Sequence, residues 1–259
     1  MNWAQLSPDS VSKLSVYDFL AYMGKRVLNP GGLTGREQVI DRIQPRPNLH
    51  ILEIGGGFGQ TACQIAQQYR CKVTSIDISP RAVNAAQGLV KQLGLGDWVR
   101  CEVGDVNDLR FRDAMFDAVV CEAVLTFLSH QQALSEVRRV LREQGVFVGL
   151  ECCWRQLPPA AVREATATIC RCDTLNFHSL EGWVGALRDA NFATIHAAEH
   201  PVRLLSLKGL VCNEGWSNSV RIAQNVFRRR GTLVRMAELW KHFSRNSEYF
   251  SYAVFSAIK

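Results

Sequence analysis

The residues of this chain that could do chemistry stand where short apolar runs end. A first run carries Glu53 and leads into four glycines, Gly55, Gly56, Gly57 and Gly59. Glycines let a backbone turn sharply and approach a ligand closely, and a helix that begins after them presents free N–H groups to negative charge. Residues 51–66 therefore predict a strand, a tight turn and a helix that together hold a nucleotide cofactor.

The glycine turn alone leaves the cofactor open, because a dinucleotide, ATP and S-adenosylmethionine all use turns of this kind. A dinucleotide fingerprint has glycine where Gln60 stands, and a phosphate-binding loop has a lysine that is missing here. Three further acids follow apolar runs. Asp77 stands where an acid can hold both ribose hydroxyls, Asp105 could receive an adenine amino group, and Glu122 ends the next run.

Apolar runs alternate with segments of helical periodicity along most of the chain. The runs that suit buried strands are residues 50–55, 72–78, 99–105, 116–124 and 145–154. Helical segments, such as residues 80–94 and 131–141, separate several of these runs. This alternation predicts a parallel sheet that is covered by helices on both faces.

The flanking segments complete the predicted fold. We expect helices at residues 10–28, 33–43 and 179–192, with Thr34 near the cap of the second and Ser179 capping the third, and strands at residues 192–205 and 249–259. The last strand follows a long helical segment, which favours an antiparallel pairing. The sequence therefore predicts an α/β, Rossmann-like sheet of seven strands, mostly parallel, with an antiparallel last strand.

We expect one domain over residues 1–259, with a core that binds the cofactor at residues 45–154. Residues 1–44 would form an N-terminal helical cover, and residues 155–177 and 206–245 would be insertions that extend it. Loops and small helices that leave strand ends lie over the ligand crevice in open α/β sheets. These three segments are thus predicted to cover the substrate.

The series of motifs resembles the class I S-adenosylmethionine-dependent methyltransferases, chiefly those of quinone, sterol and natural-product metabolism. The likeness covers about residues 31–154: E-x-G-x-G-x-G, an acid ending the second strand, GD-[ILV] after the third, FD-x-[ILV] entering the fourth, and a helix, turn and fifth strand. It departs from many relatives at Gln144-Gly145, where they have Pro-Gly-Gly. S-adenosylmethionine is the cofactor that this resemblance implies.

The resemblance also implies roles for individual residues. Glu53 would orient the methionine amino group, and the glycine turn would lie against the methionine portion. Asp77 would bind the ribose, with Ile78 packed on the adenine. The remaining cofactor-binding residues that we predict are Gly55, Gly56, Gly57, Asp105, Val106, Glu122, Ala123, Gly32 and Thr34. Of these, Gly32 and Thr34 belong to NPGGLT, which resembles a turn that closes over the methionine carboxylate.

The catalytic residues are less sharply indicated, because S-adenosylmethionine already carries an activated methyl group. The protein must align a nucleophile and exclude water, and it needs a base only where the nucleophile must lose a proton. Glu122 and His178 are the catalytic candidates. The alternatives are a cofactor contact for Glu122 and a capping or solvent role for His178. Tyr17 could line an apolar pocket or simply pack at helical spacing.

Nine cysteines have spacings that differ from the C-x₂-C pairs of structural zinc, so we predict no metal site. The N-terminus lacks the pattern of a signal peptide, and no apolar run reaches the roughly 18 residues that span a bilayer. We therefore expect a cytoplasmic protein with reduced thiols and no stable membrane insertion.

The formal net charge is +6, and the segment from Leu207 to Arg245 holds eight Lys/Arg and two acids, an excess equal to that net charge. Such a segment could attract an anionic substrate, a membrane surface or nucleic acid, or could simply be a solvated helix face. The run of Arg228 to Arg230 lacks interleaved aromatic residues, which argues against nucleic acid.

The predicted function is methyl transfer from S-adenosylmethionine to a small, apolar or aromatic acceptor by in-line displacement. Two alternatives remain at this point: a non-catalytic partner protein that binds S-adenosylmethionine, and an RNA methyltransferase. Whether the protein forms a homodimer is left open.

Overall fold

The computed structural model describes residues 6–172, 174–202, 207–229 and 231–259. Its centre is a seven-stranded sheet with the order β3-β2-β1-β4-β5-β7-β6. The strands are β1 (His50–Ile54), β2 (Lys72–Asp77), β3 (Val99–Val103), β4 (Phe116–Glu122), β5 (Leu141–Trp154), β6 (Ala193–Pro201) and β7 (Phe250–Ile258). Pairing is parallel from β3 to β5, whereas β7 runs antiparallel to both β5 and β6. The predicted fold class and the antiparallel last strand are confirmed.

Helices cover both faces of this sheet. One face carries α3 (Gly32–Ile43), α4 (Gln60–Tyr69) and α5 (Pro80–Leu93), which pack on apolar side chains such as Ile51 and Val120. The other face carries α6 (His130–Val140) and α8 (Leu180–Asp189), which pack on Leu52 and Phe147. The strands in the middle of the sheet therefore bury side chains on both sides, which explains why they read as continuous apolar runs, whereas the edge strands β3 and β6 keep exposed residues.

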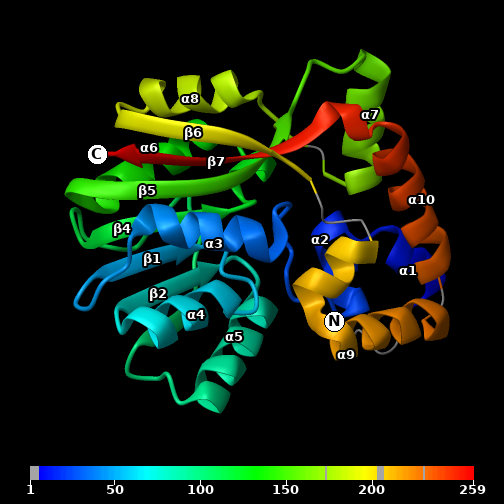
Figure 1. The fold of residues 1–259 in the computed structure, drawn as a ribbon, viewed down its shortest axis with the longest axis horizontal. Coiled ribbons are helices and arrows are strands. Elements are labelled where there is room, and N and C mark those ends of the chain that lie inside the picture. The colour runs from blue at the N-terminus through cyan, green and yellow to red at the C-terminus, as the bar shows by residue number, and fades with distance from the viewer. Residues whose placement is uncertain (1–5, 173, 203–206, 230) are drawn as a thin grey trace.

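A separate group of helices stands beyond the carboxyl ends of the parallel strands (Figure 1). We call it the cover: α1 (Pro8–Ser12), α2 (Val16–Met23), α7 (Ala160–Cys170), α9 (Leu207–Arg228) and α10 (Thr232–Arg245). Its own core includes Phe19, Met23, Ile222 and Leu239. The N-terminal segment and the two long insertions thus meet at the end of the sheet where ligands bind in open α/β folds.

Two local predictions about the N-terminal helices are wrong. Residues 10–28 form two helices rather than one, because Ser15 Oγ accepts the Asp18 N–H and starts α2 anew, and Gly24 with φ of 98° ends it. Thr34 does not cap α3. That helix begins at Gly32 and has no side-chain cap. Ser179 does cap α8, since its Oγ accepts the Gly182 N–H at 3.1 Å. Part of the strand predicted at 192–205 lies outside the described residues.

Candidate cofactor and active site

The glycine turn after β1 is shaped by contacts that leave no room for side chains at two of its glycines. The N–H groups of Gly55 and Gly56 both donate to Ile76 O, at 2.8 and 3.0 Å, which ties the turn to β2. Gly55 has a φ of 71°, and a Cβ on it would overlap Val124. A Cβ on Gly56 would overlap Ser75 Oγ. Glycine is therefore required at Gly55 by both conformation and space, and at Gly56 by space.

Asp77, at the end of β2, holds the same turn from the opposite side. Its Oδ2 accepts the Gly57 N–H at 2.9 Å, and its Oδ1 accepts the Ser79 N–H at 2.8 Å. Next to it, the side chain of Ile78 is 72% exposed, although it is large and apolar. An exposed apolar side chain beside a fixed carboxylate can receive a flat ring while the carboxylate receives hydroxyl groups.

Glu53 lies under the turn and is buried. Ser75 Oγ donates to its Oε2 at 2.6 Å. Burial raises the pKa of Glu53 to about 8, an effect that the Ser75 hydrogen bond opposes. At neutral pH the apo protein therefore holds this carboxyl mainly in its neutral form, ready to ionise beside a cation.

Glu122 ends β4, and both of its carboxylate oxygens are occupied. Asn29 Nδ2 donates to Oε2 at 2.6 Å, and Thr61 Oγ1 donates to Oε1 at 2.8 Å. The next residue, Ala123, has a φ of 58°, and its N–H donates to Leu150 O. Glu122 thus joins the N-terminal segment to α4, an arrangement that fits a positioning role better than proton abstraction.

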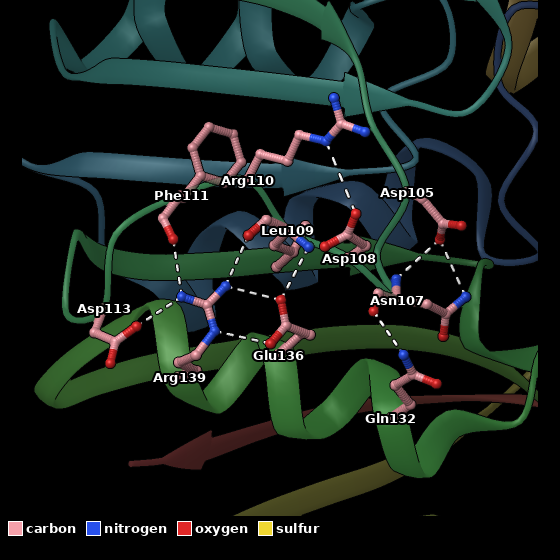
Figure 2. Close-up of polar contacts among 10 residues, drawn as sticks. All are labelled: Asp105, Asn107, Asp108, Leu109, Arg110, Phe111, Asp113, Gln132, Glu136 and Arg139. Carbon is pink, nitrogen blue, oxygen red and sulfur yellow. Dashed lines mark hydrogen bonds and ion pairs between the residues drawn. The ribbon is translucent and has the colours of Figure 1, made fainter.

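The loop after β3 is fastened to α6, as Figure 2 shows. Arg139 on α6 donates to the carbonyl oxygens of Leu109 and Phe111, at 2.7 and 2.8 Å, and pairs with Asp113 and Glu136. The Arg139 hydrogen bond lowers the pKa of Glu136. Nearer the cavity, the backbone N–H of Asn107 caps Asp105 Oδ1 at 2.9 Å. These contacts hold the carboxylate that is predicted to meet the adenine.

The predicted cofactor residues of the core surround one cavity of about 480 Å³. Its lining includes Glu53, Gly55, Gly56, Gly57, Asp77, Ile78, Asp105, Val106, Glu122 and Ala123. The volume lies within the usual range for small-molecule sites. The structure therefore brings together ten residues that were predicted from four separate strand ends.

Three predicted site residues do not line this cavity. A Cβ on Gly32 would overlap Asn213 of α9, and the neighbouring Leu33 N–H donates to that side chain. Gly32 thus serves the junction between α3 and the cover, whereas Thr34 is exposed on α3. His178 packs its ring against His130 and Trp183, with ring centroids 4.7 and 4.8 Å away. This placement offers no support for His178 as a catalytic residue.

Two polar residues that sequence reasoning missed do line the cavity. Arg36 on α3 is buried, and its Nε has no hydrogen-bond partner among the described residues. Asn29 Oδ1 is also buried and without a partner in that part of the chain. A buried guanidinium with a spare donor suits a carboxylate. In the helical pattern of residues 33–43, nothing in the sequence distinguishes Arg36 from a residue that faces solvent.

Glu151 on β5 was also missed, because it stands within an apolar run. Its carboxylate is buried and accepts the N–H groups of Val124, Leu125 and Thr126 at 3.0–3.1 Å. Burial raises its pKa to about 7. These hydrogen bonds fix the short 3₁₀ turn η2 (Leu125–Phe127), which carries Phe127 into the cavity wall.

The described residues include no group of three or more His, Cys, Asp or Glu side chains placed to hold a metal ion. A search of the same residues finds no helix that is both long enough and apolar enough to span a membrane.

Comparison with known proteins matches residues 52–149 to a methyltransferase domain. That range runs from β1 through the glycine turn to β5 and contains most of the cavity's polar wall. Among relatives, norajmaline N-methyltransferase of Rauvolfia serpentina is 34% identical over 113 residues, which is 43% of this chain and 39% of that enzyme. The matched domain and the named relatives support a class I S-adenosylmethionine-dependent methyltransferase. Its cofactor is S-adenosylmethionine, and its named relatives place it with the methyltransferases of small molecules.

This methyltransferase has a relative that matches over more of its length. A protein of Haemophilus influenzae without an assigned function is 26% identical over 215 residues, 82% of this chain and 85% of the relative. A solved structure of phosphoethanolamine N-methyltransferase 2 from Haemonchus contortus, in complex with S-adenosyl-L-methionine, covers 98% of this chain and 57% of that chain. Its TM-score is 0.75 at 18% identity, a likeness of fold.

The residues in the cavity fit the cofactor of this methyltransferase. The unpartnered Arg36 Nε suits the methionine carboxylate, and the ionisable Glu53 suits the ammonium group. A Cβ on Gly57 would meet no protein atom within 4 Å, so the glycine turn is open beside the cavity at that residue. The donor set is thus complementary to each polar group of an amino acid joined to a nucleoside.

Proposed function

We propose that this methyltransferase transfers a methyl group to a small, apolar or aromatic acceptor by in-line displacement, assisted mainly by positioning. The observation that carries the proposal is the wall that the cover gives to the cavity. The cover contributes Val16, Tyr17, Ala21 and Cys170, with Phe127 and Leu128 from the turn after β4 beside them, whereas Glu53, Asp77, Asp105 and Glu122 lie on the core side. Asp18, Arg26 and Arg171 also line the cavity on the side of the cover. A cavity with carboxylates on one side and a cluster of apolar side chains on the other suits a charged cofactor and an apolar acceptor.

Tyr17 brings a phenol hydroxyl to the apolar side chains of this wall. Its ring packs edge-on against Phe127, with centroids 5.1 Å apart. Burial raises the pKa of the Tyr17 phenol well above its ordinary value, with nearby acidic groups adding to the effect. The phenol is therefore a hydrogen-bond donor at neutral pH, and its ring offers a face to developing positive charge.

The chain's own residues supply placement rather than a strong base. When bound, S-adenosylmethionine supplies a methyl group already activated on a sulfonium. Both carboxylate oxygens of Glu122 accept hydrogen bonds, one from Asn29 and one from Thr61. Glu122 therefore holds these two side chains in place at the cavity and does not remove a proton. The cover closes over the acceptor and excludes water, which strengthens the electrostatic contacts inside. We infer that the acceptor presents a nucleophile that needs little activation.

The test is an acceptor screen with S-adenosylmethionine labelled in its methyl group. Aromatic and aliphatic amines, phenols and thiols would be compared with phosphorylated, strongly polar amines and with RNA. We expect turnover on the apolar set. Phe127→Ala should raise the acceptor KM about tenfold, the value of one aromatic contact, with cofactor affinity within about twofold of wild type. Turnover confined to RNA or to polar amines would overturn the proposal, and cofactor binding without any turnover would indicate a non-catalytic partner protein.

A further inference from the structure

The second half of α9 exposes an apolar stripe. After the bend at Gly215, where φ is 72° and ψ is 164°, the exposed residues Trp216, Val220, Ala223 and Phe227 follow one another. Their spacing of four, three and four residues puts them on one side of a helix. Trp216 is 75% exposed and Phe227 is 74% exposed. Large aromatic side chains thus point into solvent along about three turns.

Helix α10 repeats this pattern. Leu233, Ala237 and Trp240 are exposed at spacings of four and three residues, and Val234 beside them is 66% exposed. We call the exposed residues of both helices the outer face of α9 and α10. Figure 1 shows the second half of α9 and α10 at the edge of the molecule, away from the sheet.

The outer face is not needed for packing within the chain, because the same helices bury a second apolar side. Ile222 and Leu239 are buried in the core of the cover, together with the partly buried Val226 and Phe243. The protein therefore already anchors α9 and α10 through their inner sides. A surface helix of this kind would ordinarily be polar on its outer side.

The exposed charges beside the outer face are mostly positive. Arg221, Arg228, Lys241 and Arg245 are exposed. Between Trp216 and Arg245 the only acid is Glu238, which is already paired with Arg235 at 3.6 Å. Exposed tryptophan and phenylalanine flanked by arginine and lysine are the composition of helices that lie in the interface of an anionic membrane.

We propose that the outer face of α9 and α10 docks this methyltransferase on an anionic lipid bilayer, with its aromatic side chains at the level of the headgroups. The positive charges beside the outer face favour an anionic bilayer over a second copy of the chain as the binding partner. In a symmetric dimer, the four cations would face the same four cations of the second copy. Each subunit would have only one acid to offset them. An anionic bilayer complements the cations and receives the aromatic side chains at the same time.

Helix α2 lies between the docked helices and the cavity. Asn225 of α9 donates to Met23 O of α2 at 2.9 Å, and Arg229 donates to Tyr22 O. Helix α2 in turn gives Val16 and Tyr17 to the cavity wall. A bilayer on the outer face would therefore bring a lipid-dissolved acceptor close to the cover. This consequence rests on the proposed function, whereas the docking itself does not.

The experiment measures sedimentation of the full chain with two kinds of vesicle, phosphatidylcholine alone and phosphatidylcholine mixed with phosphatidylglycerol. We expect binding to the anionic vesicles at low ionic strength, weakening as salt is added. The double variant Arg228→Gln/Lys241→Gln should bind about 25-fold more weakly, since each cation near an anionic surface contributes about fivefold. The triple variant Trp216→Ser/Phe227→Ser/Trp240→Ser should lose at least about tenfold.

A matched control removes exposed apolar side chains elsewhere. Leu93 on α5 and Val103 on β3 are 41% and 56% exposed, so Leu93→Ser/Val103→Ser should bind vesicles as the wild type does. A thermal shift with S-adenosylmethionine shows that each variant is folded. The proposal is overturned if the wild type ignores anionic vesicles at low salt, or if the triple variant binds as well as the control. Light scattering that shows a dimer dispersed by the triple variant would also overturn it. None of these readouts depends on methyl transfer.

Discussion

At the residue scale, Arg36 is buried while its Nε lacks a hydrogen-bond partner among the described residues. A charged donor without a partner costs stability, and a carboxylate ligand would remove that cost. We therefore expect Arg36→Met to weaken S-adenosylmethionine binding about 10- to 100-fold, the range of one charge-assisted hydrogen bond. The apo protein should keep or raise its melting temperature.

Calorimetric titration and thermal unfolding measure the two effects of that variant. Arg42→Met is the matched control, because Arg42 lies on the same helix but does not line the cavity. Unchanged cofactor affinity in Arg36→Met would show that Arg36 is only a packing residue.

Glu53 predicts a pH dependence, because burial raises its pKa to about 8. A neighbouring ammonium group favours the ionised carboxylate. Binding of S-adenosylmethionine at pH 7 should therefore release a proton, and affinity should rise with pH up to about 8. Titrations in buffers of different protonation enthalpy measure the released proton, and Glu53→Gln should abolish it. Binding without proton exchange in the wild type would contradict this role.

The same group sets the sign of a stability change in the apo protein. Because the folded-state pKa of Glu53 is raised, its neutral form favours folding, and this contribution is fully present below the ordinary pKa of 4.5. It is lost as pH rises through about 8. The unfolding free energy should therefore fall across that window by more in the wild type than in Glu53→Gln, as urea denaturation at a series of pH values would show.

At the element scale, the loop after β3 depends on α6 for its shape. Arg139→Ala removes hydrogen bonds to two loop carbonyls and the ion pairs with Asp113 and Glu136. We expect faster amide hydrogen exchange over residues 105–113 and about a threefold to tenfold loss of cofactor affinity, about the value of one neutral hydrogen bond. Arg138→Ala is the control, since Arg138 donates to Asn191 O and not to the loop. Equal exchange in both variants would contradict the link.

The elements of the core were predictable because most of its strands are buried on both faces and each strand ends at a turn signal. The five runs from residue 50 to 154 overlap β1 to β5. The break at Ser15 was not visible, because residues 10–28 keep apolar residues at helical spacing across it. Only the capping bond from Asp18 N–H shows that the chain starts a new helix there.

At the scale of the whole molecule, some residues of the site could be predicted from the sequence pattern and others could not. Gly55, Asp77 and Asp105 follow strands, so the fold class alone predicts that they meet at one edge of the sheet. Arg36 and Glu151 gain their roles from tertiary burial. Arg36 is covered only where α3 packs on the sheet, and Glu151 turns inward from an apolar strand. His178 was misleading, because its ring packs against Trp183 and against His130, which is distant in sequence, instead of lining the cavity.

The most direct test of the assigned site is a thermal-shift titration of the wild type and Asp77→Ala. The ligands are S-adenosylmethionine and S-adenosylhomocysteine, with NAD and ATP as controls. A ligand at about 100 times its dissociation constant should add about 2.7 kcal/mol of stability. We expect stabilisation of the wild type by the two sulfur compounds alone, and its loss in Asp77→Ala. Stabilisation by NAD, or an equal response of Asp77→Ala to S-adenosylmethionine, would contradict the site described above.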